Sequence, residues 1–456
     1  MSRDQPRLPR REFLQGAAAL VALPSLAGGA TDEPSWLWSG AITDRSAIVK
    51  VAFSEPPAVT PALLVSTSRD LRDAVRVEGR ATLRPSRSRD GRTVIEYTLE
   101  GLAAATEYFA GLRTDSGTRL RLRTFGRGPF SFTAAFASCA GGTRLVPASH
   151  VSNSRVFDAI AALDPHVFIH MGDFHYYNII GPASPPDLLL GRFRRALDRV
   201  LSQEHQALFY RRTPLVYMWD DHDYGPNDAD SRSPTRTAAR TYYAEDVPHY
   251  PLPLAAAHDG PIAQSFDIGR VRFLVTDARS ERLESAGTLL GPAQKAWLLA
   301  ELDRAAAERA PLVVWVNPVP WITADGDGDG WGKFADERRD IGARIAALGF
   351  GPRLVMLSGD AHMLAFDDGR NNLHGGFPVA QAAPLDRYVR RKGGPYSHEP
   401  ARQQNHQFAT LEVDDTGTVL TATLQGYRFT GAATPVPVPE TRLRIECAGL
   451  RCTLVP

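Results

Sequence analysis

The chain has 456 residues, of which 43% are hydrophobic and 23% charged, and its formal net charge at pH 7 is +1. These proportions are typical of a soluble globular protein, and the length favours two domains over one. The nearly balanced charge excludes an overall field that would draw the chain to nucleic acid or to an anionic membrane surface, so nucleic-acid binding is not indicated.

Residues 1–30 are typical of an export signal. The adjacent Arg10 and Arg11 precede a moderately apolar stretch over 13–26 and small residues over 27–30. The apolar stretch is too short for a membrane-spanning helix, and no other segment approaches the ~20 apolar residues that one needs. The arginine pair resembles a twin-arginine signal, which predicts export through the twin-arginine machinery and a periplasmic or secreted protein. An ordinary secretory signal with a chance arginine pair is the alternative.

Residues 32–125 contain short segments that alternate between apolar and polar residues or are rich in β-branched ones, with Pro, Gly and Asp between them. No helical period is evident, so we expect a small β-sandwich of the fibronectin type III kind as an N-terminal domain. Residues 126–129 (Gly-Arg-Gly-Pro) are typical of a linker.

From residue 130 to 456 the pattern changes, because apolar strands alternate with helical stretches. The helices are expected near 151–162, 190–205, 292–307 and 335–348. Such alternation predicts a layered α/β domain in which helices cover buried strands.

Four of these predicted strands end in residues that could bind a metal. The residues are Cys139, Asp173, the pair Asp221 and His222, and the pair Asp360 and His362. Ligands in open α/β folds bind outside the carboxyl ends of strands, so these side chains should converge. One Gly-Asp pair alone is usually a turn, but four such endings are hard to explain as turns.

Asp220, Asp221, His222 and Asp223 follow one another directly after an apolar run. Four adjacent ionisable groups repel and desolvate poorly unless something neutralises them. A solvated turn or a metal site would each explain the stretch.

The three cysteines of the chain leave one thiol to explain. Cys447 and Cys452 are close enough in sequence to form a disulfide across a short loop, if the compartment is oxidising. Cys139 is then the odd one, and a lone cysteine is usually a buried structural thiol.

Taken together, the motifs resemble those of the PhoD-like, or alkaline phosphatase D, family of metallophosphoesterases. The resemblance rests on Cys139 in FASC, Asp173 and Tyr176 in GDFHYY, and the motifs WDDHD and SGDAH, and it spans most of the chain. It implies an α/β catalytic domain over 130–456, built as a four-layer α/β/β/α sandwich and preceded by the small β-sandwich.

The resemblance also implies a binuclear metal centre, commonly Fe³⁺ with Ca²⁺. Carried over, Cys139, Asp173, Tyr176 and His362 would hold the iron; Asp173 would bridge to a second metal bound by Asp221 and Asp360. The donor types agree with this, since thiolate and phenolate suit ferric iron and Ca²⁺ prefers carboxylate oxygens. Cys139 would then be a ligand and not an idle thiol.

The expected mechanism is attack on phosphorus by a hydroxide that the two metals share. His222 would face the leaving-group oxygen as acid or charge stabiliser, and Asp220 would orient His222 or cap the following turn. Asp223 is expected to be an ordinary solvated turn acid.

Further candidates have weaker signals. Asn317 ends another strand and could contact the second metal or the substrate, although Asn there is usually a turn residue, and His175 could line the pocket or be a partly exposed loop residue. The candidate phosphate contacts are Arg144, Arg194, Arg195 and Arg279.

The acidic segment 325–336 has the spacing that begins an EF-hand calcium loop, with Asp325, Asp327, Asp329 and Asp336 at ligand positions. No helical pattern precedes it, so a loop at the rim of the pocket is favoured and an extra calcium site is the alternative.

The sequence therefore predicts an exported, metal-dependent phosphoesterase that hydrolyses phosphate esters. Phosphodiesterase or phospholipase D-like action on a lipid or cell-wall polymer is the alternative within enzymes. A surface-binding protein with a degenerate metal site is the alternative of another class, and the presence of every carried-over ligand argues against it.

Overall fold

A computed structural model of the chain describes residues 33–82, 92–114, 117–141, 150–182, 185–254 and 260–455. The predicted export signal over 1–30 lies outside these residues. In the described part of the chain, no helix combines the length and the apolar character that crossing a bilayer requires.

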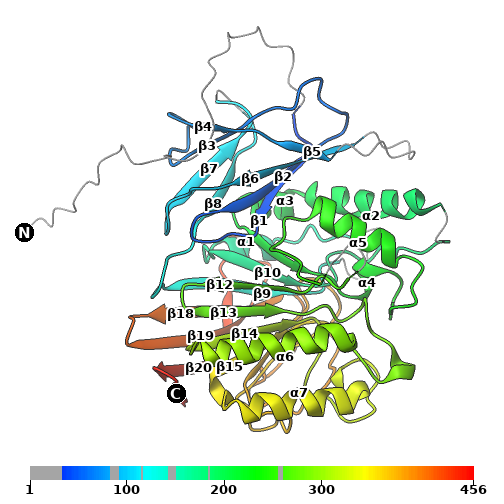
Figure 1. Cartoon of the computed structure of the whole chain (residues 1–456), viewed down its shortest axis with the longest axis vertical. Helices are drawn as coiled ribbons and strands as arrows, with labels where there is room; N and C mark the ends of the chain where they lie inside the picture. The colour runs from blue at the N-terminus through cyan, green and yellow to red at the C-terminus, as the bar shows by residue number, and fades with distance from the viewer. Residues whose placement is uncertain are drawn as a thin grey trace, which may run out of the picture.

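The largest sheet of the described residues has eleven strands (Figure 1). Their order is β21(Arg451–Val455), β20(Val438–Ala448), β19(Val419–Arg428), β18(Gln407–Asp415), β9(Phe132–Ala137), β10(Val167–Met171), β11(Leu215–Met218), β1(Trp36–Gly40), β2(Ala47–Phe53), β6(Thr93–Leu99) and β5(Arg80–Thr82). Strands β9, β10 and β11 are parallel neighbours, so their carboxyl ends lie at one edge.

A second, six-stranded sheet packs on the first. Its order is β12(Gln264–Ile268), β13(Val271–Val275), β14(Leu312–Asn317), β15(Leu354–Ser358), β17(Val379–Ala382) and β16(Leu364–Asp367). Here β13, β14, β15 and β17 run parallel.

Seven α-helices of the described residues lie in the two outer layers of this catalytic region or, in the case of α4, beyond the end of β11. They are α1(Val156–Ala161), α2(Pro186–Leu201), α3(Glu204–Tyr210), α4(Asp221–Tyr224), α5(Arg236–Asp246), α6(Gly291–Ala307) and α7(Ala335–Ala347). All four helices expected from the sequence are present. The bounds of α2, α6 and α7 agree with the expected ones to within a few residues, and α1 is shorter than expected. Figure 1 shows α6 and α7 beyond the six-stranded sheet, with α2 and α5 on the other side of the molecule.

Alternate residues of β14 face opposite cores, as a strand between two apolar layers requires. Val314 and Val316 belong to the core between the two large sheets. Val313 and Trp315 belong to the core that the sheet shares with α6 and α7. The predicted four-layer α/β/β/α arrangement is therefore confirmed.

The N-terminal region is rich in β-strands, as predicted. A four-stranded sheet, β4(Val75–Val77), β3(Leu63–Ser66), β7(Glu107–Gly111) and β8(Leu120–Arg123), packs into the same core as β2 and β6. The other N-terminal strands join the eleven-stranded sheet, because β1 pairs in parallel with β11 at Gly40 and Leu215. The division into domains over 32–125 and 130–456 consequently stays a prediction.

Strands β20 and β21 form a hairpin in which Cys447 and Cys452 are directly opposite and are joined by a disulfide. The disulfide suggested by the sequence is thereby confirmed, and Cys139 is a buried free thiol.

Candidate metal centre

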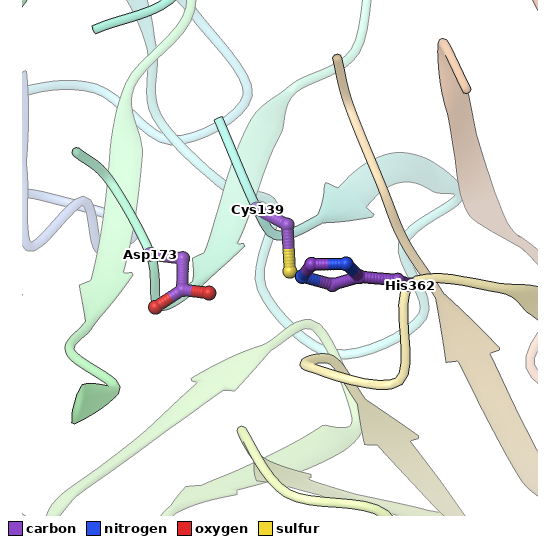
Figure 2. A group of neighbouring side chains, drawn as sticks. All are labelled: Cys139, Asp173 and His362. Carbon is purple, nitrogen blue, oxygen red and sulfur yellow. The ribbon is translucent and has the colours of Figure 1, made fainter. Parts of the chain in front are cut away.

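Three side chains from segments far apart in the sequence meet beyond the strand ends. Cys139 follows β9, Asp173 follows β10 and His362 lies shortly after β15. One ligand atom from each lies within 4.8 Å of the others, and all three side chains are buried (Figure 2). This separation is what a single ion between them would need.

A second group shares Asp173 with the first. Asp173, Asp221 and His222 also offer ligand atoms within 4.8 Å of one another. Asp221 is the first residue of α4, which begins soon after β11 ends. Because Asp173 belongs to both groups, it stands where a bridging carboxylate would stand between two ions.

Tyr176 completes the first group. Its hydroxyl donates a hydrogen bond to Oδ2 of Asp173 at 2.7 Å and lies 3.3 Å from Nε2 of His362. A Cβ placed on Gly141 would lie 2.2 Å from the Tyr176 ring, so only glycine there lets the ring sit against the chain after Cys139. The predicted iron ligands are thus neighbours in space.

The backbone at these positions is strained. The φ angles of Cys139, Asp173, Asp360 and His362 are 64°, 55°, 58° and 53°, a region that residues with a side chain seldom adopt. Such strain persists only where the surrounding structure imposes it, and it concentrates at functional sites. Gly172, at φ 88°, brings the chain so close that a Cβ would lie 2.3 Å from Cβ of Asp220.

Asp360 is held by a lysine that the sequence did not single out. Lys392 donates hydrogen bonds from its ammonium to both carboxylate oxygens of Asp360, at 2.9 and 3.1 Å, and to Asp329 at 2.5 Å. Asp329 belongs to the acidic segment 325–336, which accordingly lies at the rim of the site, as favoured. Asp325 instead forms an ion pair with Arg338 at 2.5 Å. Because Asp325 and Asp329 pair with different basic side chains, the structure does not support a calcium site that the two acids share.

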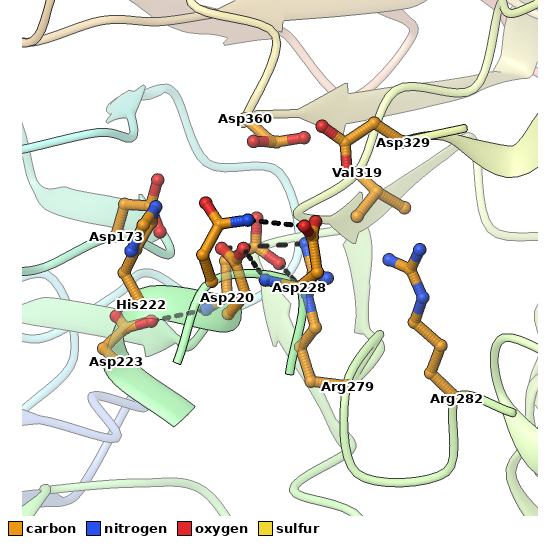
Figure 3. Close-up of polar contacts among 12 residues, drawn as sticks. Asp173, Asp220, His222, Asp223, Asp228, Arg279, Arg282, Val319, Asp329 and Asp360 are labelled. Carbon is orange, nitrogen blue, oxygen red and sulfur yellow. Dashed lines mark hydrogen bonds and ion pairs between the residues drawn. The ribbon is translucent and has the colours of Figure 1, made fainter. Parts of the chain in front are cut away.

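Asp220 and Asp223 serve the fold around α4. Arg279, which is fully buried, donates from Nε to Oδ1 of Asp220. Asp223 accepts from the backbone N–H groups of Asp220 and Phe174 at 2.7 and 2.9 Å and from the Tyr217 hydroxyl at 2.6 Å. The expectation of a solvated Asp223 is therefore wrong, because these three donors replace water. Figure 3 shows Asp223 beside Asp220.

His222 is positioned by Asn178 and not by Asp220. Its Nδ1 lies 2.5 Å from Oδ1 of Asn178, so Nδ1–H donates to the amide oxygen and Nε2 is left for the site. Residues two apart in a helical turn do not face each other, which explains why Asp220 binds Arg279 and does not orient His222. The ring of His222 packs against Tyr176, with centroids 4.3 Å apart.

Burial and like charge oppose ionisation of Cys139, Asp173 and Tyr176. The pKa of Asp221 is lowered instead, because the effect of burial is outweighed by the positive charge of Arg279 together with its other neighbours. Burial raises the pKa of the Cys139 thiol well above its ordinary value, and the carboxylates of Asp173 and Asp360 add to the shift. Burial also raises the pKa of Asp173 and of the Tyr176 phenol, with further contributions from neighbouring negative groups. A bound cation would reverse this balance, because it stabilises thiolate, phenolate and carboxylate together.

Several buried atoms at the site have no hydrogen-bond partner among the described residues. They are Oδ1 of Asp173, Oδ1 of Asp221 and Nδ1 of His362. A buried polar atom without a partner is unfavourable, so these atoms fit a site that receives metal ions.

The weaker candidates are placed less favourably. Asn317 is fully buried; its Nδ2 donates to Thr276 at 2.8 Å, and its Oδ1 accepts from Nε1 of Trp331 at 3.1 Å. Both polar groups are thus used inside the fold, and a contact of Asn317 with metal or substrate has no support. His175 is buried, contrary to the exposed alternative, and burial lowers its pKa to about 3.

The four arginines suggested as phosphate contacts differ in their positions and partners. Arg279 lies at the site but is paired with Asp220, and Arg194 is paired with Glu245 and Asp246 of α5. Arg195 lies on the exposed face of α2, and Arg144 lies outside the described residues.

Arg387 is a site residue that sequence reasoning missed, like Lys392 and Asn178. Its guanidinium lies 3.9 Å from the centroid of the Tyr176 ring. Arg387 and Lys392 come from irregular chain after β17, where no strand ending marks a residue for attention.

Comparison with known proteins gives a family and a fold. The family model described as PhoD-like phosphatase matches residues 134–383. A solved structure entitled "Structure of PhoD" is 16% identical, covers 94% of each chain and gives a TM-score of 0.66. The purple acid phosphatase PPD1 from yellow lupin (Lupinus luteus) seeds is 12% identical, with a TM-score of 0.63 over 91% of this chain and 75% of that one. No curated protein matches.

Proposed function

The chain belongs to the PhoD-like phosphatase family and is a phosphoric ester hydrolase, and we propose that it works with a pair of metal ions that share Asp173. The observation that carries the proposal is the membership of Asp173 in two separate groups of ligand atoms, each within 4.8 Å. A carboxylate with one buried oxygen left without a partner suits a bridging role.

The donor sets favour two different metals. Cys139, Tyr176 and His362 would hold Fe³⁺ with Asp173, because thiolate, phenolate and imidazole are good donors to a ferric ion. Asp221 offers a carboxylate oxygen close to Asp173 for the second position. Asp360, which belongs to neither group of ligand atoms and is paired with Lys392, would offer another, and carboxylate oxygens suit Ca²⁺. When bound, the metals would lower the pKa of a water molecule that attacks phosphorus and would offset the charge that develops on the phosphoryl oxygens.

Although His222 offers a ring nitrogen within 4.8 Å of ligand atoms of Asp173 and Asp221, we assign it to the leaving group and not to the metal. The contact with Asn178 keeps the proton on Nδ1, so Nε2 carries a second proton only when the ring is an imidazolium. That proton can pass to the leaving-group oxygen as the P–O bond breaks. Arg387 and Lys392 would add positive charge at the phosphoryl group once a cation takes over the neutralisation of Asp360.

Export is part of the proposal. The twin-arginine-like signal over 1–30 would direct the chain to the twin-arginine machinery and so to the periplasm or the exterior. The disulfide between Cys447 and Cys452 supports an oxidising compartment, since disulfides persist there.

The test is hydrolysis of p-nitrophenyl phosphate by the purified chain, before and after treatment with a chelator and after addition of Fe³⁺ and Ca²⁺. We expect activity that the chelator abolishes and the metals restore, with Asp173→Asn inactive throughout. Full activity after complete metal removal, or in the Asp173→Asn variant, would overturn the proposal.

A further inference from the structure

A basic groove of about 480 Å³ lies beside the metal centre. Its walls are residues 177–180, which follow the Tyr176 loop, and one face of α2, with His150 between them. Three arginines line it, Arg192, Arg195 and Arg199, and the lining residues that the structure describes include no acidic one. Positive charge is therefore concentrated in a concave surface.

The three arginines share a face of α2 because they are three and four residues apart. The other face of the helix is occupied: Phe193 and Leu197 are buried in the core, and Arg194 pairs with Glu245 and Asp246. The arginine on the core side is thus neutralised by two carboxylates.

Arg192 and Arg199 differ in their contacts. Arg192 donates to the backbone carbonyl of Ile180 and so holds the loop wall against α2. The exposed guanidinium of Arg199 makes no hydrogen bond or ion pair with any residue in the described part of the chain. Arg199 is available to an anion, and guanidinium groups bind phosphate in a bidentate way.

Asn178 connects the groove to the reaction. It lines the groove, and its amide oxygen accepts the hydrogen bond from Nδ1 of His222. Figure 1 shows α2 and α4, which carries His222, on the same side of the molecule, and α5 contacts both helices. A leaving group released beside His222 would therefore extend along residues 177–180 into the groove.

We infer that the groove is a second anion-binding subsite, and that the enzyme prefers phosphate esters whose leaving group carries a further phosphate. The inference rests on the proposed function, because His222 marks the leaving-group side only if it has the role proposed above. Tyr177 and Ile179 supply apolar wall for the carbon chain between the two phosphates.

The test compares alkanediol bisphosphates, from propanediol to octanediol, with the alkyl monophosphates of the same chain length. The two substrates of a pair differ only in the terminal phosphate. The measured quantity is the ratio of kcat/KM for the bisphosphate to kcat/KM for the monophosphate, at low and high salt.

For at least one chain length we expect a ratio of about 10 or more in the wild type, reduced by high salt as screening predicts. Arg199→Glu should lower that ratio at least about 5-fold while leaving monophosphate kcat/KM unchanged, and Arg195→Glu/Arg199→Glu should lower it further. Arg451→Glu, the same charge reversal at an exposed position of β21, should leave it unchanged. An equal ratio in the wild type and Arg199→Glu would overturn the inference.

A second readout separates this inference from the proposed function. If neither substrate of a pair is hydrolysed, the proposed function fails, but calorimetric titration of octanediol bisphosphate into chelator-treated protein still tests the groove. Binding that weakens at least about 5-fold in Arg199→Glu, and not in Arg451→Glu, supports the subsite. Equal binding by all three proteins contradicts it.

Discussion

Lys392 spans two acids at the centre of the site, because its ammonium contacts Asp360 at 2.9 and 3.1 Å and Asp329 at 2.5 Å. The side chains of Lys392 and Asp360 are only 16% and 7% exposed. Although burial lowers the pKa of Lys392, the two carboxylates more than offset that effect and raise it above its ordinary value. A metal ion bound by Asp360 would supply the same neutralisation.

Lys392→Met should consequently destabilise the metal-free protein more than the metal-loaded protein. Removing one partner of a buried ion pair costs about 3 kcal/mol in unfolding free energy, and a bound cation should recover most of it. Thermal unfolding with and without metal measures the difference. Lys295→Met is the matched control, since Lys295 forms an ion pair at 2.8 Å with the exposed Asp340, and exposed pairs contribute little to stability. Equal losses with and without metal would contradict this account of Lys392.

The role of His222 predicts a dependence on the leaving group. His222→Ala should lower kcat for an alkyl phosphate about 100-fold or more, because an alkoxide must be protonated as it leaves. For p-nitrophenyl phosphate the loss should be less than about 10-fold, because the phenolate is a stable anion. Asn178→Ala should show the same pattern with smaller losses, since His222 itself stays and loses only the acceptor at Nδ1. Identical losses for the two substrates would show that His222 does not protonate the leaving group.

The raised pKa of the buried Asp386 carboxyl group should make the stability of the protein depend on pH. It is buried and accepts a hydrogen bond from Ser152 at 2.6 Å, and burial raises its pKa to about 6. The unfolded chain, with a carboxyl pKa of about 3.9, binds fewer protons between these two values. The contribution of the Asp386 carboxyl group to the unfolding free energy is therefore fully present below pH ~4 and is lost as the pH rises through ~6.

Asp386→Asn should remove that loss and make the protein more stable than the wild type by about 2 kcal/mol at pH 8, but not at pH 4. Denaturant unfolding at the two pH values measures the difference. Asp414→Asn, at the end of β18, is the control. A gain at pH 4 as large as that at pH 8 would contradict the assignment of the pH effect to Asp386.

The layered fold and the convergence at the site could be predicted because both follow from local patterns. Parallel strands place their carboxyl ends at one edge of a sheet, so Cys139 and Asp173 could be expected to meet from their sequence positions. The disulfide between Cys447 and Cys452 could also be predicted from a local pattern, since the two cysteines are only five residues apart in the sequence.

Contacts that depend on irregular chain could not be predicted. Lys392 and Arg387 come from loops without a period, and only the fold shows that they lie over Asp360 and Tyr176. Asp223 looked like a surface acid because the donors that bury it, on Tyr217 and Phe174, are brought together only by tertiary structure. The pairing of β1 with β11 was hidden for the same reason, since it joins segments separated by most of the N-terminal region.

The central claim is that one carboxylate, Asp173, serves two metal ions. The most direct test is the metal content per chain of the wild type and of Asp173→Asn, measured by mass spectrometry after loading with Fe³⁺ and Ca²⁺ and removal of free metal. Asp327→Asn, which changes an exposed acid in the rim loop, is the control. The account predicts two ions per chain in the wild type and the control, and loss of both in Asp173→Asn. A wild type that binds no metal, or an Asp173→Asn variant that keeps both ions, would contradict it.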